Sequence, residues 1–522
     1  MNALLIYPRF PETYWSFKHA LSFLGKRAAQ PPLGLMTVAA MLPRSWNKRL
    51  VDENVERLRD RDLAWADVAL ISAMHIQKDA MLAILARCRA LGLRTVVGGP
   101  IASSLPAAEI NADHVVIGES ESLMATLASD LERGAAKPVY QAVERPALET
   151  SPLPDISLIK MDRYSTMAVQ YSRGCPFNCE FCDIIEIYGR RPRTKAVEQV
   201  IAELDQLRAA GWRESVFIVD DNFIGNKQRA KELCAELARW RIQSKTNISF
   251  ITEASLNLAD DRELMQLMKD AGFVSVFLGI ETPDASGLIA ANKLQNTRRS
   301  MLESVAIIQS YGMQVMGGFI LGFDTDREDI FERMTDFIQK SGIPIAMVGL
   351  LQAMPGTQLF RRLWREGRIL DAGGGDNTFC DRLNFLPRMD AAKLVEGYRE
   401  VLKKIYSCEA YYERVKLYLS RTHPRHEKQT TRQKWLTKGN VRALVTSIVR
   451  QGVFGRQRWS YWRFVITVAT RYRHCIGAAM TLAVMGYHFQ VMTQKLSKAI
   501  DSVTQPGESG ETLHRESGRQ SL

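Results

Sequence analysis

Residues 172–182 read Ser-Arg-Gly-Cys-Pro-Phe-Asn-Cys-Glu-Phe-Cys, so Cys175, Cys179 and Cys182 stand at i, i+4 and i+7. An apolar run at 167–172 precedes them and is typical of a buried strand, so we expect the three thiols on one loop after that strand. Three thiolates can hold three irons of a [4Fe–4S] cluster and leave the fourth iron open for an exogenous ligand. A zinc site would need a fourth Cys or His, and none lies nearby in the sequence.

The chain around this loop alternates between apolar runs and helical patterns. Strands are predicted at 167–172, 215–221, 248–255, 274–281, 314–322 and 345–353. Helical patterns between them lie at 196–210, 229–240, 261–271 and 297–311. This alternation predicts a partial (β/α)6 barrel over 165–355, in which chemistry is expected at the carboxyl ends of the strands.

The cysteine motif resembles the signature of the radical S-adenosylmethionine (SAM) superfamily, in which an aromatic residue precedes the last cysteine, as Phe181 does here. The resemblance covers about 165–355 and implies the same partial barrel. It further implies that the amino and carboxylate groups of SAM bind the open iron. An electron from a donor such as flavodoxin or ferredoxin would then split the S–C5′ bond and yield a 5′-deoxyadenosyl radical.

Polar residues and glycines at the predicted strand ends occupy the positions where this superfamily binds SAM. The candidate SAM-binding residues are Asp220, Asp221, Asn222, Glu253, Glu281 and Gly318. Asp220-Asp221-Asn222 stands where the family has Gly-Gly-Glu near the methionine amino group. Glu253 is expected to bond the ribose hydroxyls, and Gly318 is expected to let the backbone approach the adenine.

Residues 1–137 show a separate strand–helix alternation. Apolar runs at 3–7, 49–51, 68–72, 95–97 and 114–117 predict parallel strands, with helices at 33–42, 78–91 and 123–131. This order predicts a Rossmann-like α/β domain whose ligands bind at the carboxyl ends of the strands. The following range, 138–164, opens with several prolines and is predicted to be a linker.

The order of α/β domain, linker and cysteine motif resembles the cobalamin-binding branch of the radical superfamily. The branch's motifs after the third and fourth strands have counterparts in Ser72-Ala73-Met74 and Gly98-Gly99-Pro100. Its first motif, Asp-x-His-x-x-Gly, is absent, which implies a base-off cobalamin without a histidine from that loop. Met74 or His75 would then approach the lower face of the cobalt. A domain for another nucleotide is the alternative, although neither a Gly-x-Gly-x-x-Gly motif nor a P-loop is present.

Composition is typical of a reduced, cytoplasmic globular protein. Hydrophobic residues make up 46% and charged residues 24% of the 522 residues. Three of the eight cysteines are clustered and five are scattered, which indicates one metal site and no disulfide framework. The N-terminus has no basic segment before a long apolar core, so no signal peptide is predicted. The range 501–522 is predicted to be a disordered tail.

The range 356–500 is predicted to be helical, and its second half is strongly basic. The net charge is +12, and 428–500 contains thirteen Lys or Arg without one Asp or Glu. The apolar segment 476–487 is shorter than the roughly 20 residues of a membrane span. We expect a packed helical bundle with a solvated basic face, or an interfacial segment that contacts anionic lipid on the cytoplasmic face. A nucleic-acid surface is less favoured, because no recognised RNA-binding module is present.

These resemblances predict a cobalamin-dependent radical methyltransferase that acts on an unactivated carbon. Methylcobalamin would deliver its methyl group to a substrate radical, and a second SAM would remethylate the cobalamin. The runs 14–17 and 31–35 and the chain order are similar to the hopanoid C-2 methylase group, so the expected substrate is a small molecule or a lipid such as a hopanoid. The alternatives are a radical oxidation or rearrangement without methyl transfer, a non-catalytic cobalamin-binding sensor, and a tRNA-modifying enzyme suggested only by the pI of about 9.3.

Overall fold

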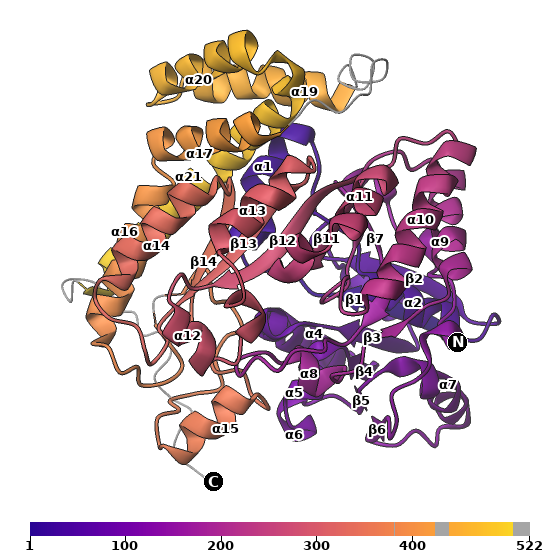
Figure 1. The fold of residues 1–522 in the computed structure, drawn as a ribbon. Helices are drawn as coiled ribbons and strands as arrows, with labels where there is room; N and C mark the ends of the chain where they lie inside the picture. The colour runs from indigo at the N-terminus through magenta and orange to yellow at the C-terminus, as the bar shows by residue number, and fades with distance from the viewer. Residues whose placement is uncertain (381, 423–437, 505–522) are drawn as a thin grey trace.

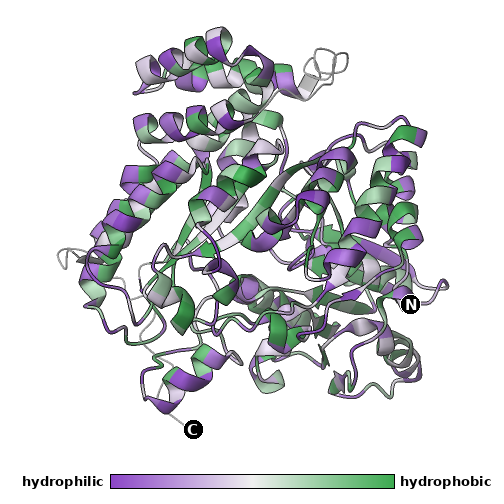
Figure 2. Cartoon of the chain, viewed as in Figure 1, coloured by the Kyte–Doolittle hydropathy of each residue, from purple (hydrophilic) through white to green (hydrophobic). Residues whose placement is uncertain are grey.

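The computed structural model describes residues 1–380, 382–422 and 438–504. Within these residues the chain forms two six-stranded parallel sheets, a two-stranded ribbon and a C-terminal layer of helices (Figure 1). Hydrophobic residues follow the strands of the second sheet, which are mostly green to white in Figure 2, whereas the surrounding helices alternate green and purple. This colouring is expected when both faces of a parallel sheet are covered.

The first sheet has the strand order β2-β1-β3-β4-β5-β6, and all of its neighbouring strands are parallel. Its strands are β1 (Asn2–Tyr7), β2 (Asn47–Asp52), β3 (Val68–Ser72), β4 (Arg94–Gly98), β5 (His114–Ile117) and β6 (Val139–Gln141). Five of them lie where the sequence predicts strands. The sixth, β6, begins in the range predicted as linker, so the sheet extends beyond residue 137.

Helices cover both faces of this sheet, because successive strand residues point to opposite sides. Leu4 and Ile6 of β1 face one hydrophobic cluster, and Ala3 and Leu5 face the other. The first cluster is completed by α3 (Asp60–Trp65), α4 (Lys78–Ala90), α5 (Pro100–Ser104) and α6 (Ala107–Ile110). The second is completed by α2 (Leu33–Met41) and α7 (Met124–Arg133). The sheet is therefore doubly wound, as predicted.

The second sheet has the order β14-β13-β12-β11-β10-β7, so sequential strands are neighbours and the two end strands are not paired with each other. The strands are β7 (Met167–Val169), β10 (Val216–Ile218), β11 (Phe250–Ala254), β12 (Phe273–Glu281), β13 (Gln314–Leu321) and β14 (Ile345–Leu350). Connecting helices are α9 (Val197–Ala209), α10 (Lys227–Gln243), α11 (Arg262–Ala271), α12 (Ala285–Ala290), α13 (Met301–Ser310) and α14 (Ile330–Ser341). This is the predicted open barrel of six strands.

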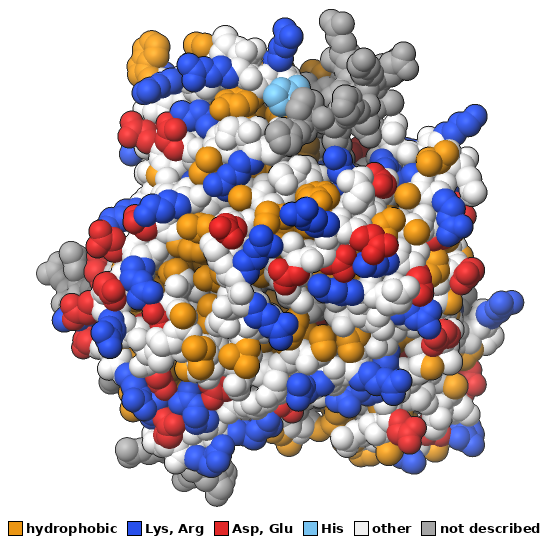
Figure 3. Space-filling view, viewed as in Figure 1, with side chains coloured by type: hydrophobic (Ala, Val, Ile, Leu, Met, Phe, Trp, Pro, Cys, Tyr) orange, Lys and Arg blue, Asp and Glu red, His pale blue; other side chains and the backbone are white. Residues whose placement is uncertain are grey.

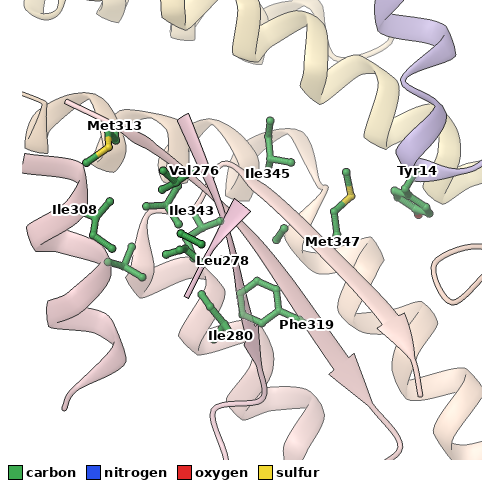
Figure 4. Packing of buried hydrophobic residues seen from close by; sticks show 14 of the residues in the cluster. Tyr14, Val276, Leu278, Ile280, Ile308, Met313, Phe319, Ile343, Ile345 and Met347 are labelled. Atoms are coloured by element: carbon green, nitrogen blue, oxygen red, sulfur yellow. The ribbon is translucent and has the colours of Figure 1, made fainter. Parts of the chain in front are cut away.

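The barrel helices are held to the strands by one hydrophobic cluster. Val276, Leu278 and Ile280 of β12 are fully buried, and Figure 4 shows them beside Ile308 of α13. Burial of a large aliphatic side chain stabilises a fold by about 1.5–3 kcal/mol. The residues between them on β12 point to the opposite side, which is the inner face of the barrel.

Most helices of the C-terminal region stack outside this barrel, beginning with two that pack against α14, whereas the first of them lies beside the loop that carries the three cysteines. They are α15 (Gln358–Arg365), α16 (Ala391–Ile405), α17 (Cys408–Arg421), α19 (Lys438–Ser447), the π-helix η9 (Ile448–Val453), α20 (Arg458–Arg471), η10 (Arg473–Cys475) and α21 (Ile476–Thr504). One helical stretch, Arg473–Ser502, is long and apolar enough to cross a membrane, but half of its apolar window is buried in the protein. Because α21 packs against α16, α17 and α20, we interpret it as the core helix of this region. It extends four residues into the predicted tail, and 505–522 lie outside the described residues.

The segment between β1 and α2 leaves the first sheet and packs on the C-terminal region. It contains η1 (Tyr14–Ser16) and α1 (Lys18–Leu24), and α1 lies against α19 and α21 (Figure 1). The Tyr14 hydroxyl lies 2.9 Å from Thr493 Oγ1, and His488 Nε2 lies 2.9 Å from the Tyr14 carbonyl oxygen. An N-terminal segment is thus part of the same core as the last helix.

Candidate active site

The three clustered cysteines lie on the loop that follows β7. A short antiparallel ribbon, β8 (Ser172–Arg173) with β9 (Arg193–Thr194), forms the base of this loop. Gly174 follows β8 with φ +94°, and a Cβ there would stand 2.9 Å from the Gly189 carbonyl oxygen. Only glycine fits this turn without strain. Gly174 therefore sets the direction in which the chain leaves β8 and enters the cysteine loop. The loop ends at the short helix α8 (Ile184–Ile187).

Amide groups from two other loops are directed at the cysteine sulfurs. Asn222 Nδ2 lies 3.6 Å from Cys175 Sγ, and Gln295 Nε2 lies 3.8 Å from Cys179 Sγ. Asn222 is the last of the three predicted residues after β10, whereas Gln295 belongs to η8 (Leu294–Asn296). Hydrogen bonds to sulfur stabilise a thiolate and tune the potential of a bound cluster.

A largely buried lysine supplies positive charge beside the same thiols. Lys293 Nζ forms an ion pair of 2.8 Å with Glu281 Oε1 and lies 6.0 Å from the centre of the Phe181 ring. Burial alone would lower the pKa of Lys293, but the charges of Glu281 and Cys179 raise it above its usual value, so the ammonium is held charged. Burial raises the pKa of Cys179, and the charge of Lys293 opposes that rise.

These residues fit a [4Fe–4S] cluster. Among the described residues, no three His, Cys, Asp or Glu side chains converge as ligands of a single metal ion do. In a cubane each thiolate binds a different iron, so its cysteines need not meet at one point. Two amide donors to sulfur and a buried ammonium group match the needs of an anionic cluster with three thiolate ligands.

The acidic residues after β10 and β11 are not equivalent. Asp220 is fully buried and accepts hydrogen bonds from the Tyr171 backbone N–H and the Ser172 hydroxyl, both at 2.7 Å, so it ties the end of β10 to the cysteine loop. Asp221 has a buried carboxyl oxygen without a partner among the described residues. Burial and then the charge of Asp220 raise the pKa of Asp221 to about 7. Burial and then the charges of both aspartates raise the pKa of Glu253 to about 8.

Two other predicted SAM-binding residues have local partners in the structure. A Cβ on Gly318 would stand 2.8 Å from Phe277 Cζ, so the aromatic ring lies over this glycine. Glu281 adopts φ +68° and is engaged by Lys293, and a Cβ on Gly279 would stand 2.3 Å from its Oε1. Phe181 packs edge to face on Phe323, with ring centroids 6.2 Å apart.

The predicted cobalamin motifs meet at the carboxyl edge of the first sheet. Ser72 ends β3 and pairs in register with Gly98 of β4. Gly99 has φ +86°, and a Cβ there would stand 2.5 Å from Ser72 Oγ. Because residue 99 is a glycine, the two loops approach each other closely and form a cradle that a side chain would fill. Such a cradle suits the tail of a large cofactor.

The loop after β3 also carries the two candidates for the lower cobalt face. Met74 is exposed, whereas His75 is buried and neither of its ring nitrogens has a partner among the described residues. Burial and then Lys78 lower the pKa of His75, which keeps the imidazole neutral. Gln77 holds this loop to the first strand's loop by donating to the Pro8 carbonyl oxygen at 2.5 Å.

Ion pairs connect the carboxyl edge of the first sheet to the cysteine loop. Arg173 lies two residues before Cys175 and pairs with Glu119 at 2.6 Å and with Glu121 at 2.8 Å, both after β5. Arg193 of β9 also pairs with Glu119 at 2.6 Å. These side chains are largely buried, so the two sheets are joined where both candidate sites lie.

Sequence patterns did not indicate Lys293, Gln295 or Arg362. The first two stand in a loop without periodicity, and the one available signal was Glu281, an acid at a buried strand end that needs a cation. Arg362 of α15 pairs with Glu180 of the cysteine loop at 2.5 Å, across 182 residues of sequence. The C-terminal region thereby contacts the cysteine loop directly.

Three parts of the chain match models of known protein families. Residues 27–128 match the B12 binding domain, 169–338 the radical SAM superfamily, and 357–502 a domain of unknown function. An uncharacterized methyltransferase of Synechocystis is 41% identical over 94% of this chain and 91% of its own length. The hopanoid C-2 methylase of Rhodopseudomonas palustris is 35% identical over 95% of this chain and 94% of its own length. This chain belongs to the cobalamin-dependent radical SAM methyltransferases.

Solved structures share the fold of this methyltransferase. TsrM from Kitasatospora setae, with cobalamin and a [4Fe–4S] cluster bound, has a TM-score of 0.58 at 14% identity and covers 96% of this chain and 99% of its own. OxsB, with aqua-cobalamin and SAM bound, has a TM-score of 0.58 at 15% identity and covers 96% and 80%. The predicted fold class is confirmed, as are the three cofactors: the [4Fe–4S] cluster, SAM and cobalamin.

Proposed function

We propose that this methyltransferase transfers a methyl group to an unactivated carbon of an apolar polycyclic lipid of the hopanoid type. The observation that carries the proposal is the extent of the similarity to hopanoid C-2 methylase, which spans 95% of this chain and 94% of that relative. Such coverage extends beyond the two cofactor domains and takes in most of the C-terminal helical region. By contrast, bacteriochlorophyllide d C-12(1)-methyltransferase is 26% identical over 74% of this chain.

The inner face of the barrel supports an apolar substrate. Phe277 alternates with the buried residues Val276 and Leu278 on β12, so it points inward, and it is partly exposed. Trp15 of η1 packs edge to face on Phe277, with ring centroids 5.2 Å apart, and remains 40% exposed. Two adjoining aromatic rings open to solvent are suited to a fused-ring hydrocarbon.

We assign the candidate residues to cofactor binding by their chemistry. When bound, the cofactors supply the radical that abstracts hydrogen and the methyl group that replaces it. Cys175, Cys179 and Cys182 would hold the cluster, with Asn222 and Gln295 donating to two of the sulfurs. The carboxyl groups of Asp221 and Glu253 would accept hydrogen bonds from the amino group and ribose hydroxyls of SAM, and the Ser72–Gly99 cradle would seat the cobalamin tail. A reducing, cytoplasmic location suits an oxygen-sensitive cluster of this kind.

Product analysis tests the proposal. Anaerobically reconstituted and reduced enzyme is incubated with SAM carrying a trideuteriomethyl group and with a hopanoid, and lipid and nucleoside products are measured by mass spectrometry. We expect the intact deuterated methyl group on a ring carbon of the lipid, together with 5′-deoxyadenosine. Release of 5′-deoxyadenosine with an oxidised or rearranged lipid would favour the alternative radical reaction. Absence of 5′-deoxyadenosine with every lipid would favour the cobalamin-binding sensor.

Two aromatic variants refine the substrate assignment. Trp15→Ala removes one side of the proposed apolar wall, and Phe277→Ala removes the other, although the Phe277 ring also lies over Gly318. We expect KM for the lipid to rise about two- to tenfold, because a lost aromatic contact is worth about 0.5–1.5 kcal/mol. Trp364→Ala is the matched control, since Trp364 is an exposed tryptophan on α15. Unchanged kinetic constants in all three variants would place the substrate elsewhere.

A further inference from the structure

The last helices present a hairpin on the outside of the molecule. This hairpin (residues 438–471) consists of α19, η9 and α20, and it lies at the top of Figure 1. Its inner side is firmly packed. Phe464 stacks on Tyr412 of α17 with ring centroids 4.3 Å apart, and the hydroxyl groups of Tyr461 and Ser447 are hydrogen-bonded at 3.0 Å. The hairpin is thus a rigid part of the fold, and its outer face is free of contact with the described residues of the core.

Large apolar side chains stand on that outer face. Phe454, at the turn between η9 and α20, is 80% exposed, and Trp459 at the start of α20 is 76% exposed. Ile466 continues the same face of α20 two turns later and is 60% exposed. Val445 and Val449 of the first arm are also exposed. An exposed apolar patch of this kind marks an interaction surface.

Arginines without acidic partners surround these side chains. Arg456, Arg458 and Arg463 are exposed, and none forms an ion pair with the described residues, whereas Arg458 lies 5.8 Å from the Trp459 ring centre. Arg471, the last residue of α20, and Arg473 after it are exposed as well. Figure 3 shows blue and orange side chains together at the top of the molecule, with the nearest red ones lower down. No acidic residue occurs between 428 and 500 to oppose this charge.

We propose that the outer face of the hairpin docks on an anionic lipid bilayer, with Phe454 and Trp459 entering the interface and the flanking arginines contacting phosphate groups. Aromatic residues prefer the headgroup region, and arginine side chains extend to phosphate from an apolar face. The branched aliphatic residues on this face favour a bilayer over RNA, because Val445 and Ile466 cannot stack on bases. The proposal goes beyond the methyl transfer and does not depend on which substrate is methylated.

The hairpin, and not α21, makes the contact. The buried residues of α21, such as Leu482, Phe489 and Met492, face the protein core. Exposing them to lipid would open the packing of α16, α17 and α1. The bilayer therefore meets a preformed surface, and the rest of the enzyme stays in water.

Vesicle sedimentation tests the docking. The full-length reconstituted enzyme is mixed with sucrose-loaded vesicles of phosphatidylcholine, alone or with about one third phosphatidylglycerol, at low salt. We expect binding to the anionic vesicles at about 0.1 M NaCl and its loss near 1 M, where the screening length falls from about 10 to 3 Å. Equal binding to both vesicle types, or binding to neither, would overturn the proposal.

Variants locate the surface. Replacing Arg456, Arg458 and Arg463 by Gln should weaken the partition coefficient by about 100-fold, because each contributes about fivefold near an anionic surface. The matched control replaces Arg44, Arg57 and Arg61, three exposed arginines of the first domain, by Gln and changes the net charge equally. Partitioning that falls equally in both triple variants would show a net-charge effect and overturn the assignment to the hairpin.

Brominated lipids report insertion directly. We expect them to quench tryptophan fluorescence of the wild type and to lose that effect in Trp459→Phe, which keeps the apolar character of the site. Phe454→Ser with Trp459→Ser should reduce binding at least tenfold, while release of 5′-deoxyadenosine in detergent stays unchanged. Quenching that persists in Trp459→Phe would overturn the proposed orientation. A labelled RNA that displaces the enzyme from vesicles at equal mass would instead identify the surface as a nucleic-acid site.

Discussion

Arg173→Met is the most informative test of how the two cofactor domains are joined. The guanidinium group pairs with Glu119 at 2.6 Å and with Glu121 at 2.8 Å, and the three side chains are 13%, 3% and 2% exposed. Methionine replaces the aliphatic stem of the arginine but not its guanidinium group. Glu119 would keep its ion pair with Arg193, whereas Glu121 would remain buried without a cation. Breaking a buried ion pair by removing one partner costs about 3–5 kcal/mol.

This magnitude translates into a large thermal shift. For a cooperative unit of 150–250 residues, 3–5 kcal/mol lowers Tm by about 6–20 °C. The effect should depend on pH. Burial would raise the pKa of Glu121, but Arg173 holds that pKa below its usual value. The pair therefore stabilises the fold above the ordinary glutamate pKa, and its contribution is lost as pH falls through the lowered value.

In the variant the sign of the pKa shift reverses, because burial acts on Glu121 without the arginine. The loss of Tm should be largest at about pH 8 and smaller at about pH 5.5, where protonation relieves the buried charge. Scanning calorimetry of the wild type and the variant at both pH values measures it, and Arg61→Met is an exposed control. The double variant Arg173→Met/Glu121→Gln should recover part of the loss. A drop below about 2 °C at pH 8, or a drop independent of pH, would refute a buried ionic link between the domains.

Three other outcomes follow from the sites. Replacing Cys175, Cys179 or Cys182 by Ala should abolish the [4Fe–4S] signal in optical and EPR spectra and the release of 5′-deoxyadenosine; retained cluster absorption in any of them would exclude that residue as a ligand. Gly99→Ala should weaken cobalamin binding at least tenfold in an absorption titration, because its Cβ would stand 2.5 Å from Ser72 Oγ, whereas Gly98→Ala meets ordinary contacts at 3.7 Å and should bind nearly as the wild type does. Burial lowers the pKa of His488 to about 4. Unfolding therefore takes up a proton below about pH 6.5, and the free energy of unfolding falls by about 3 kcal/mol between pH 6.5 and 4. His488→Gln should flatten this part of the plot of Tm against pH, and an unchanged slope would contradict the assignment.

Local sequence patterns predicted the strands and the cluster loop well, for a physical reason. Buried parallel strands are short apolar runs, and the βα repeat places the ends of such strands at one edge. Cys175, Cys179 and Cys182 lie on one short loop, so their spacing in the sequence is enough to predict a cluster site. The same reasoning placed Ser72 and Gly99 together, because both follow strands that are neighbours in a doubly wound sheet.

Contacts between distant segments could not be predicted in this way. The Arg173–Glu119 pair joins two domains, and Lys293 reaches the cysteines from a loop without periodic pattern. Asp220 was predicted from its position at a strand end, but its partners are the backbone of Tyr171 and the hydroxyl of Ser172, which no pattern of one strand indicates. The burial of α21 likewise depends on helices that come together only in the folded chain.

The contact between Tyr14 and Thr493 has a consequence for synthesis of the chain. The two residues are 479 positions apart, so the first helix leaves the ribosome long before its partner exists. At about 5–20 residues per second, the N-terminal segment waits for roughly 25–95 s. During that time the rings of Tyr14 and Phe17 lack the surface that buries them. The segment that carries Trp15 to Phe277 can therefore be fixed in place only after translation of α21 is finished.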